Sequence, residues 1–306
     1  MDRFEAMRVF CAVIEAGSFA AAANQLGLST TAVSRHVAQL ETLLGVRLLN
    51  RTTRRMRPTD EGYAYFERST QLLADLEETE ASVSGQAQRP RGRLRLTAPI
   101  ALATLRLAPA FVAFSRRFPE VTLDLVLSDN VADFAEEGLD MAIRVGRVGS
   151  DNLVARRVAE TVVLAAASPA YLARVGLPQH PGDLARHVCL TYHYAAGGNQ
   201  AEFSQADGSV ASVRYTGPFH SNNGMLLTEM AVADAGIVFA PCFILQPLID
   251  RGALQRVLPD WHLRTLPIQV VYPTRRHLSA KVQAMTAFLT DWFAHTPWGA
   301  PTARAQ

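Results

Sequence analysis

Apolar residues at the start of the chain recur every three or four positions, as they do on one face of a helix. The segment 2–16 carries such residues at Met7, Phe10, Val13 and Ile14. Gly17 and Gly27 interrupt the pattern, and Ser18 and Ser29 follow at positions suited to helix N-caps. The pattern predicts successive helices over 2–16, 18–26 and 29–44.

The third of these segments is amphipathic. Its apolar residues are Val33, Val37, Leu40 and Leu44, and its other face carries Thr30, Thr31, Ser34, Arg35 and Ala38. A helix-turn-helix needs a small residue in its first helix, a turn glycine and an apolar anchor in its second helix. Ala23, Gly27 and Val33 have the spacing for these roles. The polar face of segment 29–44 is therefore expected to lie at the surface as a recognition helix.

Arginine is concentrated around and after this segment. The stretch VRLLNRTTRRMRPT, which begins at Val46, contains two short extended runs around a basic tip and predicts a β-hairpin wing. Residues 29–58 hold six arginines and one acid, Glu41, a local charge of about +5 against +2 for the whole chain. Such a charge suits DNA phosphates and the minor groove. The candidates for DNA contact are Ser29, Thr30, Thr31, Ser34, Arg35, His36, Arg51, Arg54 and Arg55. The alternative is a plain three-helix packing with a solvated basic loop.

A long helix is predicted from about 61 to 84, capped by Thr59 or Asp60. Its apolar residues have near-heptad spacing, at Phe66, Leu73, Leu76 and Val83. A narrow apolar seam of this kind favours pairing with a second copy of the helix. Packing of the seam on its own domain is the alternative. The polar stretch GQAQRPRG, at 85–92, predicts a linker.

The hydrophobic pattern changes after residue 92. Strands are expected in LRLTAP, VTLDLVLSD, DMAIRV, VVLAAASP, CLTY and GIVFAP. Helices are expected over about 100–118, in a stretch that runs through Glu137, and over 223–235. This alternation predicts an α/β domain with largely parallel sheets.

Composition narrows the class of protein. Hydrophobic residues form 49% and charged residues 19% of the chain, which excludes wholesale disorder. Three separated cysteines give no disulfide framework and fit a reducing compartment. No apolar stretch approaches the ~20 residues that span a bilayer, and no signal peptide is recognised. We therefore expect a cytoplasmic protein with no membrane partner. Lys281 is the only lysine among 30 lysine and arginine residues, a bias typical of a GC-rich genome.

The stretch from Ser18 to Gly62 resembles the DNA-binding domain of LysR-type transcriptional regulators. The resemblance rests on the pattern A-x-x-L-x-x-S-x-x-A-V-S-x-x-V-x-x-L-E from Ala23 to Glu41, and on LGVRLLNRTTR…PTDEG after it. The later segments GRLRLTAP, FSRRFPEVTLDL, GLDMAIRVG, ASPAYLARVGLP and AGIVFAP resemble the effector-binding domain of the family. Thr31 stands where many relatives carry proline or serine, and LLNR where LFxR is common.

The resemblance implies the domain organisation. A winged helix-turn-helix would occupy 1–59, a linker or dimerisation helix with a hinge 60–90, and an α/β effector domain 91–300. This last domain would be two-lobed, similar to type II periplasmic binding proteins, with two crossover strands. Its first lobe would comprise about 91–165 and 268–300, and its second lobe 166–267.

An effector would bind between these lobes. Residues 97–100 lie where a strand passes into a helix, and free backbone N–H groups there favour an anionic or polar ligand. The candidates for effector contact are Thr97, Pro99, Ile100, Ser128, Arg144, Tyr192 or His193, Asn222 and Asn223. Thr97 and Ser128 would donate hydrogen bonds, and Arg144 could bind a carboxylate through its fork. Two alternatives stay open: Arg144 pairs with Asp140 or Asp133, and the two asparagines cap the following helix.

Enzymes and metal sites find little support in the sequence. His187, Cys189 and His193 have no second ligand pair, and neither a G-x-S-x-G elbow nor a phosphate loop occurs. Cys242 and Asp129, the candidates for catalysis, lack an evident partner. A periplasmic solute-binding protein would have no use for a basic wing.

We therefore predict a regulator that is not an enzyme and has no cofactor or metal. Its partners would be double-stranded promoter DNA, a small effector such as a carboxylate or aromatic acid, further copies in a dimer or tetramer, and RNA polymerase.

Overall fold

The computed structural model describes residues 2–52, 55–83, 89–130, 138–148, 152–195, 198–274 and 278–295. The chain divides into two compact units, Met1–Gln88 and Arg89–Gln306, which we call unit 1 and unit 2. Each unit is described by itself.

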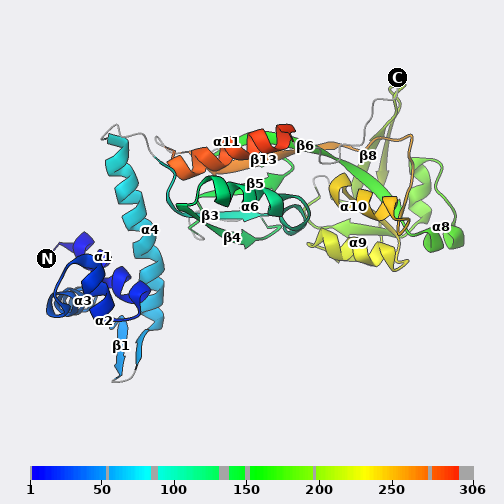
Figure 1. The fold of residues 1–306 in the computed structure, drawn as a ribbon. Coiled ribbons are helices and arrows are strands. Elements are labelled where there is room, and N and C mark those ends of the chain that lie inside the picture. The colour runs from blue at the N-terminus through cyan, green and yellow to red at the C-terminus, as the bar shows by residue number, and fades with distance from the viewer. Residues whose placement is uncertain are drawn as a thin grey trace. The chain divides into compact units, whose positions relative to one another are not determined.

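Unit 1 is a helical domain with a β-hairpin (Figure 1). Its elements are α1 (Arg3–Ala16), α2 (Phe19–Leu26), α3 (Thr30–Leu44), β1 (Leu49–Thr52), β2 (Arg55–Pro58) and α4 (Asp60–Val83). The predicted caps are present: the Ser18 side chain accepts from the Ala21 N–H, and the Ser29 side chain accepts from the Ala32 N–H, both at 3.1 Å. Gly27 ends α2 with a φ of 67°, a left-handed conformation that glycine adopts without strain.

The core of unit 1 gathers the apolar faces of its helices. Its buried residues include Phe10, Val13, Val33, Val37 and Leu40. Leu44 is 38% exposed, so the expected apolar face of α3 ends one turn early. Leu73 of α4 is buried in this core and Phe66 packs against it. These two seam residues thus pack on their own domain, the alternative that the sequence had left open.

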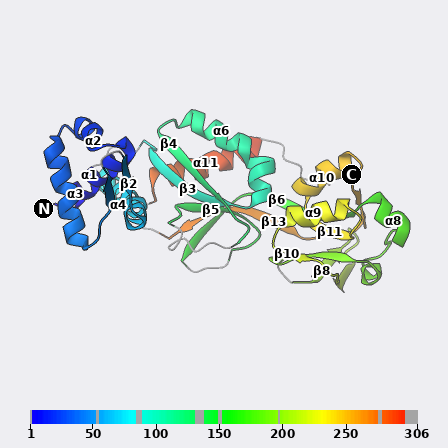
Figure 2. The same ribbon diagram turned by 90° about the horizontal axis from the view of Figure 1, so that it is seen from below.

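Unit 2 is built on a long mixed sheet (Figures 1 and 2). The strand order is β10-β7-β11-β6-β13-β5-β3-β4, with β12 paired beside β6. The strands are β3 (Gly92–Ala98), β4 (Val121–Leu127), β5 (Met141–Val145), β6 (Leu153–Ala167), β7 (Cys189–Tyr192), β10 (His220–Ser221), β11 (Ile237–Pro241), β12 (Gln255–Arg256) and β13 (Thr265–Pro273).

Two strands join the halves of this sheet. We call β4, β3 and β5 with their helices the first half, and β11, β7 and β10 with theirs the second half. Within each half these neighbours pair in parallel. The strands β6 and β13 run antiparallel to each other from Thr265↔Val162 to Pro273↔Leu153, and also antiparallel to their outer neighbours β11 and β5. The expectation of largely parallel sheets is therefore wrong at the centre, where the predicted crossover strands lie.

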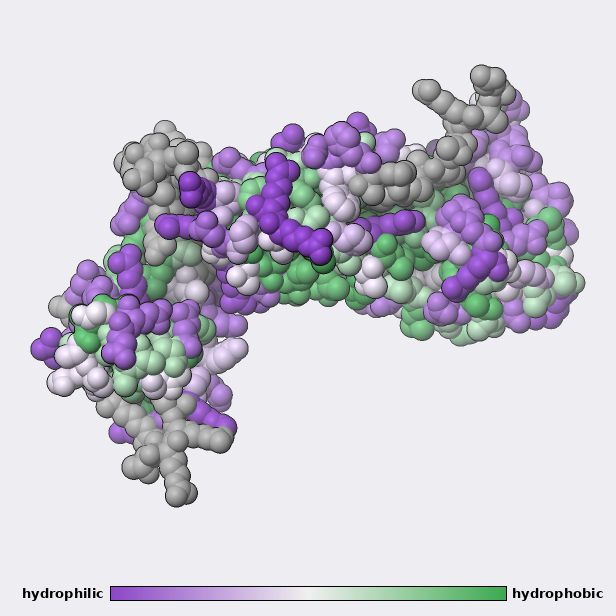
Figure 3. All heavy atoms as spheres, viewed as in Figure 1, coloured by the Kyte–Doolittle hydropathy of each residue, from purple (hydrophilic) through white to green (hydrophobic). Residues whose placement is uncertain are grey.

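Helices cover each half. The first half carries α5 (Ile100–Leu102), a π-helical turn η1 (Ala103–Leu107), α6 (Ala108–Arg117) and α11 (Ala280–His295). Phe114 of α6 meets Phe288 of α11 with ring centroids 5.4 Å apart. In Figure 3, apolar surface (green) shows where Figure 1 places α6. Among the large apolar side chains of this segment, Leu105 of η1 and Val112 of α6 are exposed. The expected helix over 100–118 is thus present, with an irregular turn inside it.

The second half has a core on each face of its sheet. One core contains α9 (Gly224–Val232) and α10 (Cys242–Asp250) and takes Leu164 and Ala166 from β6. The other core includes Ala165 and Ala167 of β6. This second core is covered by α8 (Pro169–Val175), the 3-10 turn η2 (Pro181–Arg186) and the hairpin of β8 (Gln200–Ser204) and β9 (Val210–Arg214). Alternate residues of a strand face opposite sides, so β6 serves both cores.

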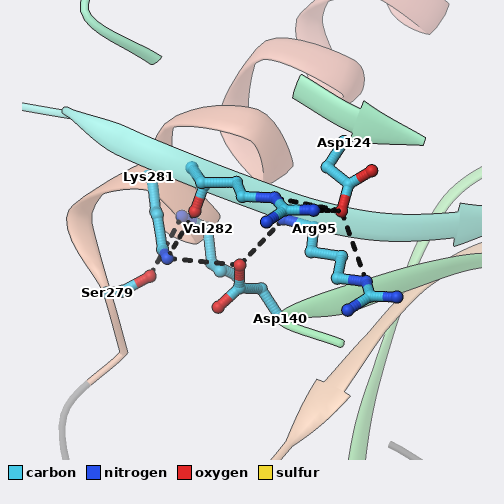
Figure 4. A network of polar contacts seen from close by, with 7 residues as sticks. Arg95, Asp124, Asp140, Ser279, Lys281 and Val282 are labelled. Atoms are coloured by element: carbon cyan, nitrogen blue, oxygen red, sulfur yellow. Dashed lines mark hydrogen bonds and ion pairs between the residues drawn. The ribbon is translucent and has the colours of Figure 1, made fainter. Parts of the chain in front are cut away.

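The C-terminal helix is tied to the sheet by a buried ion pair (Figure 4). Lys281 Nζ lies 3.2 Å from Asp140 Oδ2 and donates to the Arg93 carbonyl at 2.7 Å. Asp140 Oδ2 also accepts from the Arg95 N–H at 2.9 Å. Two arginines of β3, Arg93 and Arg95, both contact Asp124 Oδ2 on the neighbouring strand β4. The pair therefore joins α11 to β3 and to the start of β5.

None of the helices in the described ranges is long and apolar enough to cross a membrane.

Candidate nucleic-acid interface and effector site

The third helix exposes its polar face. Thr30, Thr31 and Arg35 of α3 are exposed, while Ser34 and His36 are half-buried. The opposite face, with Val33, Val37 and Leu40, is completely buried. Ser29 is exposed but its hydroxyl is engaged as the N-cap. The described surface of unit 1 thus presents the side chains that the sequence selected for base contacts.

His36 differs from its neighbours on α3. Its Nδ1 is buried and meets no hydrogen-bond partner among the described residues. One edge of the ring is therefore turned away from any external ligand. A direct contact to a base would have to use the rest of the imidazole ring.

The base of the wing is fixed by contacts of the Glu41 and Thr59 side chains, of which the sequence predicted only the cap at Thr59. Glu41 Oε1 accepts from the N–H groups of Leu48 and Leu49 at 2.9 and 3.1 Å. Thr59 Oγ1 donates to the Arg47 carbonyl at 2.8 Å and accepts from the Gly62 N–H at 2.9 Å. Glu41, the one acid of the basic stretch, is thus a structural clamp, and Thr59 is the cap of α4.

The wing hairpin itself pairs Arg51 with Met56 and Thr52 with Arg55. Arg57 on β2 is exposed. Arg54 and the side chains of Arg51 and Arg55 lie outside the described residues, so their part in DNA contact stays a prediction. Arg57 shows that positive charge reaches the surface of the hairpin.

In unit 2 three of the effector candidates come together. Thr97 and Arg144 lie on the adjacent strands β3 and β5, and both are buried. Arg144 donates from Nη2 to Thr97 Oγ1 at 3.5 Å and from Nη1 to the Ser128 carbonyl at 3.1 Å. We call Thr97, Ser128, Asp129, Arg144 and Tyr192 the Arg144 cluster.

Asp140, one of the two alternative partners of Arg144, has other partners in the structure. Asp140 is bound by Lys281 and by the Arg95 N–H, which accounts for its burial without Arg144. Asp133 lies outside the described residues.

Asp129 takes the place where a ligand anion was expected. Its Oδ1 accepts from the Ile100 N–H, at the start of the helical segment after Pro99, at 3.1 Å. Burial raises the pKa of Asp129, while the Ile100 N–H and the positive charge of Arg144 lower it. The expectation of free backbone N–H groups is therefore wrong at Ile100. The sequence offered Asp129 only as a candidate for catalysis and missed this role.

Tyr192 links the second half of the sheet to this cluster. Burial raises the pKa of Tyr192, the negative charge of Asp129 raises it further, and Arg144 lowers it. The charges of Asp129 and Arg144 in the first half thus act on Tyr192 at the end of β7.

The two asparagines have separate positions. Asn223 Oδ1 accepts from the Leu226 N–H at 3.0 Å and caps α9, as one alternative held. Asn222 and His193 are exposed. Capping does not exclude ligand contact, so Asn223 stays a predicted effector contact, as does Asn222.

Three of the candidates for metal binding and catalysis, His187, Cys189 and Cys242, are buried in the packing of the second half. His187 Nδ1 lies 3.2 Å from the Tyr171 hydroxyl, and Cys189 is buried in the core beneath it. Over the described ranges, no three His, Cys, Asp or Glu side chains are grouped to hold a metal ion. Cys242 is buried, with its Sγ 3.4 Å from Thr161 Oγ1.

Comparison with known proteins matches both units to one family. The family model for bacterial regulatory helix-turn-helix proteins of the lysR family matches residues 4–63. The model for the LysR substrate binding domain matches residues 87–294.

Individual relatives match over nearly the whole chain. An HTH-type transcriptional repressor of Pseudomonas aeruginosa is 36% identical over 303 residues, covering 97% of this chain and 94% of its own. The HTH-type transcriptional activator AaeR of Escherichia coli is 32% identical over 293 residues, covering 96% and 94%. Among solved structures, the LysR-type regulator CrgA of Neisseria meningitidis has a TM-score of 0.59 at 32% identity, covering 94% and 98%. These similarities confirm the expected fold class.

Proposed function

The chain belongs to the LysR family of bacterial transcriptional regulators, and we propose that it binds specific promoter sequences under the control of a small effector held between the halves of unit 2. A DNA-binding helix-turn-helix and a substrate-binding domain are both present. The observation that carries the proposal is the exposed polar face of α3 on a domain whose wing is positively charged.

The geometry of unit 1 supports a division of labour on DNA. Thr31, Ser34 and Arg35, near the N-terminal end of α3, suit contacts to base edges in the major groove. The wing, with Arg57 exposed, suits phosphates or the minor groove. Since promoter DNA lies in the bacterial cytoplasm, this function places the protein there.

The active form is a dimer or tetramer on two-fold-related half-sites. The helix α4 retains apolar side chains that its own domain does not cover: Leu72 is 51% exposed and Leu76 is half-buried. The side chain of Val83 lies outside the described residues. We infer that α4 pairs with a second copy through this remaining surface, and that the assembled regulator changes the recruitment of RNA polymerase.

The effector contacts the Arg144 cluster. A carboxylate or aromatic acid can be bound by the Arg144 guanidinium, with Thr97 and Tyr192 beside it. A ligand that binds one arrangement of the two halves more tightly than another shifts the population of those arrangements. The consequence is a change in the bending of the promoter and in the regulator's output.

Mapping of the genomic fragments that the purified full chain retains tests the proposed function. We expect enrichment of a motif with two half-sites related by two-fold symmetry, about one helical turn apart. The genes that flank the retained fragments then indicate acids to test as effectors. Failure to enrich any duplex at low ionic strength would contradict the proposal.

The Arg144→Gln variant tests the effector site. With an acid that changes DNA affinity, we expect the variant to need about tenfold more of that acid for the same change, because a charge-assisted pair is lost. The matched control is Arg147→Gln, which alters an exposed arginine two residues beyond β5. An equal response of both variants would remove Arg144 from the site.

A further inference from the structure

A pocket of about 340 Å³ lies in the second half of unit 2, apart from the Arg144 cluster. The β8–β9 hairpin and the crossover region form its walls. The residues that matter here are Val163, Glu202, Tyr215, Phe239, Leu263 and Arg264. None of them belongs to the Arg144 cluster, so a ligand in this pocket would occupy a second site.

One wall of the pocket is aromatic. The rings of Tyr215 and Phe239 are stacked, with centroids 4.6 Å apart and planes at 26°. Val163 and Leu263 add apolar surface beside them. A planar ring that packs against such a pair gains both burial and favourable ring contact.

The rim of the pocket carries charges of both signs. Glu202 on β8 and Arg264 before β13 are exposed. The charge of Arg264 reaches the aromatic wall: burial raises the pKa of Tyr215, and Arg264 opposes the rise. A ligand with a carboxylate and an ammonium group would complement the two charges. The volume is at the small end of ligand pockets, which suits an amino acid.

We propose that this pocket binds a zwitterionic aromatic amino acid. Its carboxylate pairs with Arg264, its ammonium group with Glu202, and its ring packs on Tyr215 and Phe239. The site differs from the effector site in its elements and in its need for both charges.

The pocket also touches the strands that join the halves of the sheet. Val163 lies in β6, and its N–H donates to the Arg264 carbonyl at 3.2 Å, just before β13 begins. Further along, β13 pairs with β5 of the first half through Ile268↔Val145. If the proposed regulator function holds, an amino acid bound here changes DNA affinity through these strands.

Calorimetry on the full chain tests the site with three probes. L-phenylalanine carries both charges, 3-phenylpropionate lacks the ammonium group, and phenethylamine lacks the carboxylate. We expect L-phenylalanine to bind more tightly than either analogue. Arg264→Gln should weaken L-phenylalanine and 3-phenylpropionate about tenfold and leave phenethylamine unchanged, since a charge-assisted bond is lost. Glu202→Gln should show the opposite selectivity between the two analogues.

Matched controls remove exposed charges outside the pocket. Arg214→Gln on β9 and Glu160→Gln on β6 should leave all three affinities unchanged. Absence of binding at millimolar concentration, or equal affinities in wild type, Arg264→Gln and Glu202→Gln, would overturn the proposal. If only Arg144→Gln lost L-phenylalanine binding, the amino acid would bind at the Arg144 cluster and not in this pocket. That result would overturn the proposed pocket site and leave the proposed function intact. Binding that leaves DNA affinity unchanged would overturn only the coupling through β6 and β13.

Discussion

Lys281 joins three elements of unit 2 through one ammonium group. It pairs with Asp140 and donates to the Arg93 carbonyl, and its side chain is only 6% exposed. A compact ammonium group forms these contacts in a space where a planar guanidinium would need different geometry.

Replacement of Lys281 by methionine should destabilise unit 2 by about 3–5 kcal/mol, because Asp140 would be buried without its counter-charge. Urea unfolding, followed by circular dichroism, measures this loss. The double variant Lys281→Met with Asp140→Asn should recover part of it, since the unpaired charge is then gone. A loss below about 1 kcal/mol in the single variant would show that the ion pair contributes little.

Gly62 is a second position where one residue decides the packing. A Cβ at this position would lie 1.9 Å from the Leu48 carbonyl oxygen. Gly62→Ala should therefore lower the stability of unit 1 by more than about 2 kcal/mol, because the backbone between the wing and α4 must move. Gly224→Ala is the control, since a Cβ there meets no atom within 4 Å. Thermal unfolding that is equal in the two variants would contradict the close approach.

The sequence identified residues whose role depends on near neighbours. Ser18, Ser29 and Thr59 were predicted as caps because a cap and its N–H partner lie two or three residues apart. Glu41 and Asp129 were missed because their backbone partners lie 7 and 29 residues away. Periodicity carries no information on contacts over such separations.

At the scale of elements, the wing and α3 differ in what they can recognise. The hairpin presents Arg57 on a base held by Glu41 and Thr59. A phosphate contact is independent of base sequence and releases counterions. The wing should therefore affect affinity for all duplexes alike.

The Arg57→Ala variant tests this role of the wing. It should weaken binding to specific and random duplexes by a similar factor and reduce the slope of log K against log salt by about 1. Fluorescence anisotropy over a series of salt concentrations gives both quantities. An unchanged slope would exclude a contact between Arg57 and phosphate.

Elements with a clear period were predicted, and those without one were missed. The amphipathic helices of unit 1 and the strands β3, β4 and β5 agree with the sequence. The helix α10 is apolar on most sides and contains Pro247, so no helical face stands out. The first part of β6 is charged and exposed, so the sequence predicted only the later part of this strand, VVLAAASP. The hairpin of β8 and β9 also went unpredicted.

At the scale of the whole molecule, the order of strands is what the sequence could not supply. The strands β6 and β13 pair over nine positions although a hundred residues separate them, and they give unit 2 its two halves. Only the resemblance to a known family indicated this crossover and the place of the effector site. The same crossover adjoins the pocket, because Val163 of β6 and Arg264, just before β13, both line it.

The affinity of the full chain for its mapped duplex and for a scrambled duplex, in wild type and Arg35→Ala, tests the account most directly. If the polar face of α3 reads bases, Arg35→Ala should lose roughly 1–3 kcal/mol on the mapped duplex and much less on the scrambled one. Equal losses on both duplexes, or no binding of the wild type to either at low ionic strength, would contradict the account.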